Sequence, residues 1–575
     1  MVRWAVWVVV GIAVPAPAAT VFVDPAGVCN GQTPCFTTIQ DGIDNSGPPP
    51  GVVFVFPGDY AESVDVSGST GDLTLRTVNG AGVPTPGTAS ILPAAGAAIR
   101  NSVTPFPGDL TIDGFILQSP DDNGMTLSTV QGALILTNLV ADGNGDNGIS
   151  ASVQSSVTIT DSSFSGHTAG FGISLSGVVG TLTFQRLTAD GNRNFNASSS
   201  LNAEVEIRDS SFSNSQTNFG LSLSGATDLT LERVTANGNQ SFNASATLMG
   251  IARVVDSSFS NSVTTFGLSL AGATDATVDG VTADNNRSFN TSVSMMGVAR
   301  VVDSSFRSSV TNFGLSFVGA TDVALDRVTA TGNSSFNTSF SLTGGPVRIL
   351  ASDFSNSKTN FGLSVTGAST ATLLGVVADG NRSFNGSISA TDRLHIEQSS
   401  FSRSVTNFGL NVLSTGDAVL RAVVAEGNAQ NGVLATSTNL RVSGSRFTNN
   451  TSDGIRISAG EPGGIRHLRC NDIASNQRGL VLFAAELVDA ENNWWGSATG
   501  PMHPSNPAGT GNPVIDGANG GAGTVDFVPF LPEPSAESGI CHQHGAPALG
   551  SSALALLAIA LLVLPAWRLS RRRAV

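Results

Sequence analysis

The stretch Asp209-Ser-Ser-Phe-Ser-Asn-Ser decides the fold of this chain, because it recurs at a nearly fixed distance. Related segments begin at Asp256, Asp303, Ser352 and Ser399. The phenylalanines of this set are 46 to 48 residues apart, at Phe164, Phe212, Phe259, Phe306, Phe354, Phe401 and Phe447. A fixed period of this length is typical of solenoids and propellers.

A second set of phenylalanines divides this repeat in two. Phe-Gly and Phe-Asn pairs alternate every 23 to 25 residues, at Phe171, Phe195, Phe219, Phe242, Phe266, Phe289, Phe313, Phe336, Phe361, Phe384 and Phe408. The structural unit is therefore a coil of about 23 to 24 residues, and the long repeat is two coils. A propeller blade needs about 40 residues, so the short period argues against a propeller.

Within a coil, apolar and small polar residues alternate, as in Leu221-Ser-Leu223-Ser. Period two indicates strands with one buried and one exposed face. No stretch of the repeat has the pattern of an amphipathic helix. We therefore expect an all-β, right-handed parallel β-helix with three strands per coil and coils about 4.8 Å apart.

Two further rows share the period of the coils. The residue after each phenylalanine of the second set is Gly or Asn, which tolerate left-handed backbone, so we expect a left-handed corner there and an aromatic stack inside the tube. Another row is predicted to form a ladder of stacked amides: Asn239, Asn286, Asn333, Asn381 and Asn428. Several asparagines also lie in glycosylation sequons, but their periodicity favours the ladder: Asn196, Asn243, Asn290, Asn337 and Asn385.

Composition and charge exclude several functions. Charged residues make up 12% of the chain, about half of the roughly 25% usual in globular proteins. The 28 basic and 43 acidic residues give −15, and without the five arginines of the two terminal segments the balance is 23 to 43, or −20. A field of this sign repels nucleic acid and anionic lipid. We expect a soluble, monomeric body with no nucleic-acid partner.

Both ends of the chain are predicted to be targeting segments. Residues 1–19 have the pattern of a secretory signal peptide. Residues 532–548 form a linker, and 549–575 are an apolar stretch followed by an arginine cluster. That arrangement resembles bacterial C-terminal sorting tails, so the helix is either retained as a membrane anchor or trimmed by a protease. Both alternatives place the protein at the cell envelope or cell surface.

The four cysteines fit an exported protein. Cys29 and Cys35 are expected to close a small loop. Cys470 is either a buried thiol or the partner of Cys541, and the sequence leaves both alternatives open.

The regions that flank the repeats resemble the pectate-lyase-like superfamily. The N-terminal part, 20–60, contains a short amphipathic turn and a buried strand that ends in Pro57-Gly-Asp-Tyr60. The coils follow over 61–485 and are clearest over 160–450. The closing segment, 486–531, contains Trp494-Trp495-Gly. The resemblance implies capped ends, with the tryptophans as a plug, although an aromatic sugar platform is the alternative.

The superfamily includes lyases and hydrolases of acidic polysaccharides, but their signatures are missing here. Asp228, Asp275 and Asp322 recur every 47 residues. Two coils separate them, about 9.6 Å at about 4.8 Å per coil, which is too far for members of one row to share a calcium ion. We therefore predict no metal site and no cofactor, with calcium as the alternative that the lyases imply.

Two functions remain. The first is a non-enzymatic surface protein that is glycan-binding, adhesive or structural, because a repeated face suits a distributed interaction. The second is an extracellular polysaccharide lyase or glycoside hydrolase with an unrecognised site. Its candidate ligand-binding residues lie in the least regular coils, and their alternative role is a solvated face near the end of the tube: Arg466, His467, Arg469, Asp472 and Asp453.

Overall fold

The computed structural model describes residues 20–102, 105–458 and 463–542. The predicted signal peptide, 1–19, and the predicted tail, 549–575, lie outside these residues. Within the described ranges, no helix is long and apolar enough to cross a membrane.

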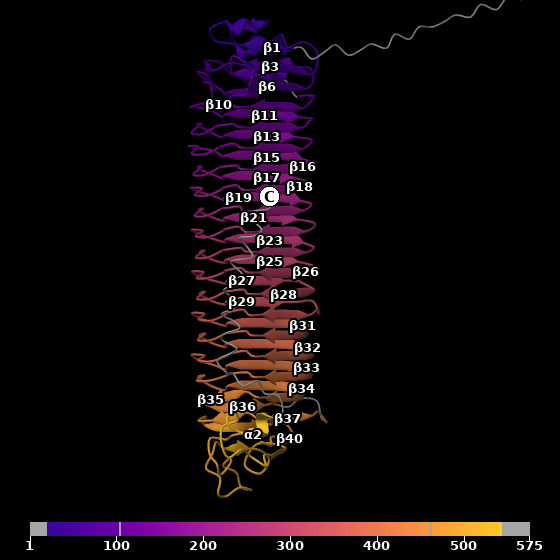
Figure 1. Ribbon diagram of the computed structural model, residues 1–575, viewed down its shortest axis with the longest axis vertical. Coiled ribbons are helices and arrows are strands. Elements are labelled where there is room, and N and C mark those ends of the chain that lie inside the picture. The colour runs from indigo at the N-terminus through magenta and orange to yellow at the C-terminus, as the bar shows by residue number, and fades with distance from the viewer. Residues whose placement is uncertain (1–19, 103–104, 459–462, 543–575) are drawn as a thin grey trace, which may run out of the picture. The chain divides into compact units, whose positions relative to one another are not determined.

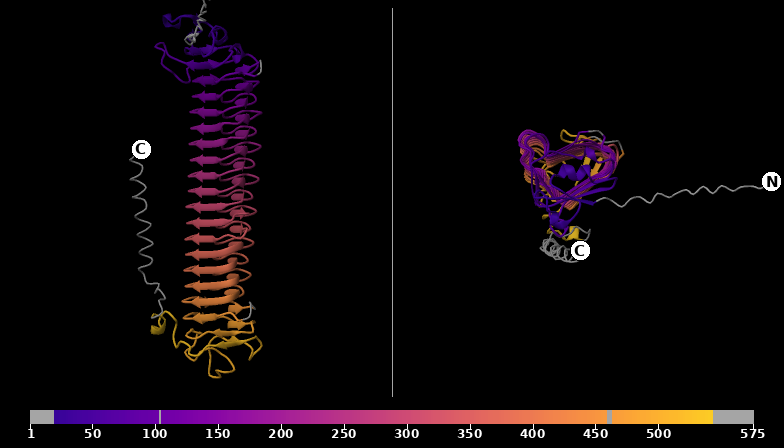
Figure 2. Two further views of the ribbon diagram at one scale, coloured as in Figure 1. Left: turned by 90° about the vertical axis from the view of Figure 1, so that its right-hand side faces the viewer. Right: turned by 90° about the horizontal axis from the view of Figure 1, so that it is seen from above.

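The chain divides into two compact units, one that ends at Thr321 and one that begins at Asp322. Each unit is an all-β parallel solenoid in which successive coils stack strand on strand (Figure 1). Seen end-on, the coils enclose a narrow three-sided interior (Figure 2). The predicted parallel β-helix is therefore present in both units.

In the N-terminal unit, each repeat coil contributes one strand to each of two long sheets. The first sheet contains β11 (Met125–Val130), β13 (Ile149–Val153), β15 (Ile173–Val178), β17 (Ala197–Leu201), β19 (Leu221–Ala226), β21 (Ala244–Leu248), β23 (Leu268–Ala273), β25 (Thr291–Met295) and β27 (Leu315–Val318). The second contains β12 (Leu134–Thr137), β14 (Val157–Thr160), β16 (Thr181–Gln185), β18 (Glu204–Arg208), β20 (Leu229–Glu232), β22 (Ala252–Val255), β24 (Ala276–Asp279) and β26 (Val298–Val302). The third side of the repeat coils is short, because neighbouring coils pair there through single residues such as Thr235 and Ser258.

The first coils of this unit are less regular. Their strands are β1 (Thr20–Val23), β2 (Cys35–Phe36), β3 (Gly51–Val55), β4 (Gly58–Tyr60), β5 (Val64–Asp65), β6 (Leu73–Thr77), β7 (Ala89–Ile91), β8 (Ile99–Asn101), β9 (Leu110–Asp113) and β10 (Phe115–Leu117). Here the third side is a true sheet of β4, β7 and β10. The helix α1 (Ile39–Asp44) buries Ile39 and Ile43 against β1 and β3, and Thr38 Oγ1 accepts from Asp41 N at its N-terminus. Cys29 and Cys35 form a disulfide.

The C-terminal unit is also wound from parallel strands, four of which, β31 to β34, are 11 or 12 residues long. The strands of this unit are β28 (Asp322–Asp326), β29 (Thr338–Ser341), β30 (Val347–Leu350), β31 (Leu363–Leu374), β32 (Gly386–Glu397), β33 (Leu410–Arg421), β34 (Val433–Ser443), β35 (Arg446–Thr448), β36 (Asp453–Ile457), β37 (Arg466–Arg469), β38 (Asp472–Ala474), β39 (Arg478–Leu482), β40 (Leu487–Asp489), β41 (Val514–Ile515) and β42 (Thr524–Asp526). The helix α2 (Gly539–His542) ends the described chain. Cys470 and Cys541 form a disulfide beside Leu531 and Trp494, which decides between the two alternatives for Cys470. Trp495 is fully buried, so its ring offers no platform to a sugar.

The two sets of phenylalanines lie on opposite sides of the backbone. The set that includes Phe212 and Phe259 is fully buried and fills the core. The set that includes Phe219 and Phe242 is only partly buried on an outer corner. Its rings do stack, with centroids 4.6 to 5.1 Å apart in the N-terminal unit, mostly edge to face. The expectation that this stack lies inside the tube is therefore wrong.

The Gly/Asn corner also differs from the expectation. Within the described chain, neither the glycines nor the asparagines after these phenylalanines have positive φ. Left-handed backbone occurs instead after the second-sheet strands, as at Asp209 (φ 52°) and Arg233 (φ 53°). Gly220 is required for space, because a Cβ there would meet the carbonyl oxygen of Phe212 at 2.3 Å.

A ladder of buried amides explains why the repeat is two coils long. Asn239 Nδ2 donates to Asn243 Oδ1 at 3.0 Å, and Asn243 Nδ2 donates to Asn286 Oδ1 at 3.0 Å. These two amides meet at the intervening coil, where Asn286 Oδ1 also accepts from Ser262 N at 2.8 Å and where a Cβ at Gly267 would meet Asn286 Nδ2 at 2.4 Å. The sequon asparagines belong to this ladder and are fully buried: Asn196, Asn243, Asn290, Asn337 and Asn385.

Candidate functional site

The partly exposed phenylalanines of the N-terminal unit form an aromatic column along one corner of its coils. We define the aromatic column as Phe171, Phe195, Phe219, Phe242, Phe266, Phe289 and Phe313, all of which are partly exposed. Each ring comes from the short segment just before a first-sheet strand, so the parallel register of those strands fixes the spacing of the rings. The column presents one apolar ring per coil to solvent.

Polar side chains border the aromatic column on both sides. Immediately before every ring except Phe171 lies a polar residue, and these form the polar column: Asn194, Asn218, Ser241, Thr265, Ser288 and Asn312. In it, Ser241 Oγ bonds Thr265 Oγ1 at 3.2 Å and Asn312 Nδ2 donates to Ser288 Oγ at 2.9 Å. Three residues after each ring lies the serine column, whose members pair in register on adjacent strands and are partly exposed: Ser198, Ser222, Ser245, Ser269 and Ser292. The three columns together form an uncharged strip of apolar rings between hydroxyl and amide groups.

The C-terminal unit carries a shorter version of the same strip. Phe336, Phe361, Phe384 and Phe408 are partly exposed, with ring centroids 4.8 to 5.4 Å apart. Asn407 Nδ2 donates to Ser383 Oγ at 2.9 Å beside them. The strip is therefore a property of both units.

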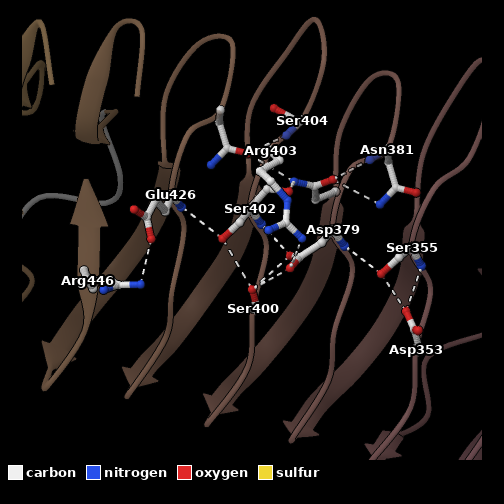
Figure 3. A network of polar contacts seen from close by, with 12 residues as sticks. Asp353, Ser355, Asp379, Asn381, Ser400, Ser402, Arg403, Ser404, Glu426 and Arg446 are labelled. Carbon is white, nitrogen blue, oxygen red and sulfur yellow. Dashed lines mark hydrogen bonds and ion pairs between the residues drawn. The ribbon is translucent and has the colours of Figure 1, made fainter. Parts of the chain in front are cut away.

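A pocket lined largely by polar side chains lies on the third side of the coils in the C-terminal unit, and Figure 3 shows its network of contacts. The Asp379 carboxylate accepts from Ser400 Oγ at 2.9 Å, from Ser402 N at 2.7 Å and from Arg403 at 3.3 Å. Glu426, two coils from Asp379, is paired with Arg446 at 2.7 Å. Both carboxylates thus serve contacts between neighbouring coils, and neither is left free as a general base.

Carboxylates also link neighbouring coils in the N-terminal unit. Asp190 accepts from Ser211 Oγ at 2.9 Å and from Ser213 N at 2.6 Å. Asp228 and Asp275, of the row considered for calcium, accept from Ile251 N and Val298 N at 2.6 Å. The described part of the chain contains no group of three or more His, Cys, Asp or Glu side chains placed to hold a metal.

The structure separates the five candidate residues predicted from the sequence. Arg466 points inward, is 1% exposed and pairs with Glu486 at 2.8 Å. Asp453 is buried and pairs with Arg478 at 2.6 Å. Asp472 accepts from the backbone N–H of Ser535 at 2.7 Å, in the segment that leads to α2. These three residues form no common site.

His467 and Arg469 do share an outer face of β37. His467 Nδ1 lies 2.7 Å from Asp489 Oδ2, and Arg469 Nε donates to the same oxygen at 3.1 Å. Burial alone would raise the pKa of Asp489, but the hydrogen bonds from Arg469 and His467 outweigh it and hold that pKa below its usual value. Sequence reasoning missed Arg441, which lies opposite His467 on β34.

A Ser-His-Asp set occurs in the closing segment. His503 Nδ1 lies 2.7 Å from Ser505 Oγ, and its Nε2 lies 3.1 Å from Asp516 Oδ1. Asp516 also accepts from two backbone N–H groups, those of Ala518 and Val525. These contacts hold the closing segment together. The backbone N–H of Ser505 also donates to His503 Nδ1 at 3.2 Å, so this nitrogen takes part in a local turn.

No protein-family model matches the chain, and no curated protein does. Among solved structures, a double mutant of the periplasmic alginate epimerase AlgG matches with 10% identity over 56% of this chain and 74% of that chain, at a TM-score of 0.28. The A-module of the mannuronan C-5 epimerase AlgE6 from Azotobacter vinelandii matches with 11% identity over 77% of this chain and 90% of that chain, at a TM-score of 0.16. These values are too low to carry an argument about the ligand or the reaction of this chain.

Proposed function

We propose that the protein is a non-enzymatic glycan-binding protein of the cell exterior. The observation that carries the proposal is the aromatic column with its bordering polar and serine columns. Such a strip repeats one weak contact many times, and repeated weak contacts on one rigid support give avidity for a long polymer.

The chemistry of the strip suits a sugar chain. A sugar ring has apolar C–H faces and a rim of hydroxyl groups, so it requires an apolar surface beside hydrogen-bonding groups. The rings of the aromatic column supply the surface, and Ser and Asn side chains can both donate and accept. Covering about 40 Å² of each ring contributes about 1 kcal/mol, so single contacts are weak and a run of them is substantial.

The state of the acids supports a binding role over catalysis. Glycoside hydrolysis requires two carboxyl groups that face one substrate bond from about 5 to 9.5 Å apart. Asp190 and Asp379 are instead held by serine hydroxyls and backbone N–H groups of the next coil. A carboxylate engaged in this way is a structural tie between coils.

Export is part of the proposal. All four cysteines are paired in disulfides, which persist in oxidising compartments. The signal peptide, the anchor or sorting tail and the monomeric state stay predictions from the sequence.

Affinity electrophoresis in gels that contain xylan, galactomannan, mixed-linkage β-glucan or alginate tests the proposal. The test variant is Phe242→Ser with Phe289→Ser. The matched control is Met249→Ser with Met296→Ser, which removes exposed apolar side chains (61% and 67% exposed) from the same two coils at another corner. Circular dichroism establishes that all three proteins are folded.

We expect at least one polysaccharide to retard the wild type and the control equally. Loss of two ring contacts should weaken binding by about 2 kcal/mol, or roughly 30-fold. Equal retardation of both variants, or no retardation of the wild type by any polymer, would overturn the proposal. Release of shorter products from any of the polymers would instead establish the lyase or hydrolase alternative.

A further inference from the structure

The outer face of the paired strands β34 and β37 in the C-terminal unit carries a shallow groove that the aromatic strip does not include. Arg441, Ser443, His467 and Arg469 line this groove. Arg441 is in register with His467, and Ser443 is in register with Arg469, on the adjacent parallel strands β34 and β37. Adjacent strands are about 4.8 Å apart, so the four side chains stand close together on one surface.

The positive charge of this groove is compensated on one side only. Arg469 and His467 contact Asp489, and Arg469 also contacts Glu491 at 3.3 Å. The exposed Arg441 guanidinium has no hydrogen-bond or ion-pair partner in the part of the chain that the structure describes. The donors of Arg441 and the exposed hydroxyl of Ser443 are therefore available to a ligand.

We infer that this groove binds a tetrahedral oxyanion, a phosphate or sulfate ester carried by a glycan. A guanidinium presents a planar fork of N–H donors that matches such groups. A carboxylate has two oxygens, which a single fork already satisfies, whereas phosphate and sulfate esters keep further oxygens for Ser443 and for the free donors of Arg469. The inference rests on the proposed function only in taking the ligand to be a glycan.

The charge of the whole chain makes such a groove selective. The chain has a net charge of −15, so anions meet a repulsive field over most of the surface. Binding at this groove should depend on direct contacts, because interactions between exposed charges more than about 10 Å apart are largely screened at 0.1 M ionic strength.

The first test uses inorganic phosphate as the probe. Binding to the full chain is followed by calorimetry at low ionic strength, for the wild type and for Arg441→Gln. The matched control is Arg348→Gln, since Arg348 is also exposed on a strand of this unit, β30, but is in register with Thr372. We expect saturable binding that is at least 10-fold weaker in R441Q and changes less than 2-fold in R348Q. No saturable binding, or equal losses in the two variants, would overturn the inference.

The second test identifies the source of the oxyanion. Affinity electrophoresis compares a phosphorylated mannan, a neutral mannan, dextran sulfate and polygalacturonate. Retardation by the phosphorylated or sulfated polymer that exceeds the others and falls in R441Q supports the inference. Retardation by polygalacturonate of equal strength would show a carboxylate site, and phosphate binding without retardation by either ester polymer would show a site for the free ion; both overturn it. Because Phe242→Ser with Phe289→Ser leaves this groove intact, failure of the aromatic strip does not alter the phosphate result.

Discussion

Replacing His167 with serine should remove a pH-dependent loss of local stability from the N-terminal unit. His167 is fully buried, and its Nδ1 accepts from Asn144 N at 3.1 Å. Its Nε2 has no hydrogen-bond partner among the described residues. The imidazole replaces an asparagine side chain of the amide ladder, because elsewhere Asn243 Oδ1 accepts the equivalent N–H of Asn239 at 3.1 Å. Serine is the residue that later coils carry at this place, as at Ser215.

The magnitude follows from the pKa of this group. Burial lowers the pKa of His167 from the ordinary 6.5 to about 4, although the charge of Asp142 works in the opposite direction. The unfolded chain takes up the proton once the pH falls below about 6.5, so stability falls from that pH down to about 4. Between pH 7.5 and pH 4.5 the local loss is about 2.5 kcal/mol. The opening equilibrium should increase roughly 70-fold.

Hydrogen exchange measures this opening residue by residue. The reporter is the N–H of Ile149, which donates to Gly172 O at 3.0 Å and keeps its acceptor in the variant. After correction for intrinsic exchange, wild-type protection should fall with acid. In His167→Ser protection should be lower at neutral pH, because Asn144 N loses its acceptor, but nearly independent of pH.

His395→Ser is the matched control, since His395 is partly exposed and bonds Glu397 at 3.1 Å. This variant should keep the wild-type pH dependence at Ile149. The reasoning is refuted if wild-type protection at Ile149 does not change with pH, or if His167→Ser retains the full dependence.

Three further outcomes are expected. Phe259→Ala should cost about 3–5 kcal/mol of unfolding free energy in urea, because the ring is fully buried, and clearly more than Phe266→Ala on the outer corner; equal costs would contradict the assignment of the two sets. Asn286→Ala should cost about 3 kcal/mol, since Oδ1 accepts from two buried groups and Nδ2 donates to two more; a cost below 1 kcal/mol would show that the ladder adds little. Replacing Cys470 and Cys541 by serine should remove up to about 4 kcal/mol of unfolding free energy, because the disulfide closes a 71-residue separation. Limited proteolysis should then cut the closing segment first, and unchanged cleavage would show that the disulfide does not hold this segment in place.

The period of the chain predicted the parallel β-helix, but it could not tell which phenylalanines face inward. Phe219, Leu221 and Leu223 have the same parity, so strand alternation places the ring inside with the leucines. The chain turns a corner at Gly220, where a Cβ would strike the Phe212 carbonyl. The turn reverses the side on which Phe219 lies. Alternation is therefore reliable only within an unbroken strand.

The same rule separates what was predictable in the candidate site from what was not. His467 and Arg469 are two residues apart on β37 and share a face, while Arg466 has the opposite parity and points inward. That separation follows from period two alone. Arg441 could not be found in this way, because it precedes His467 by more than one regular coil and only the strand register brings the two together.

The interior and the surface of the coils repeat with different periods, and this difference bears on the proposed function. The amide ladder requires two kinds of coil, one with Asn239 and Asn243 and one with Ser262 and Gly267. The aromatic column has one ring on every coil of both kinds, so the distance between its rings is set by the stacking of the strands. Contacts between neighbouring rings contribute about 0.5–1.5 kcal/mol each to the stability of the fold, so the column has a structural role as well. Because a folded Phe242→Ser, Phe289→Ser protein lacks the rings but keeps the coils, only a binding role predicts that it loses its polysaccharide.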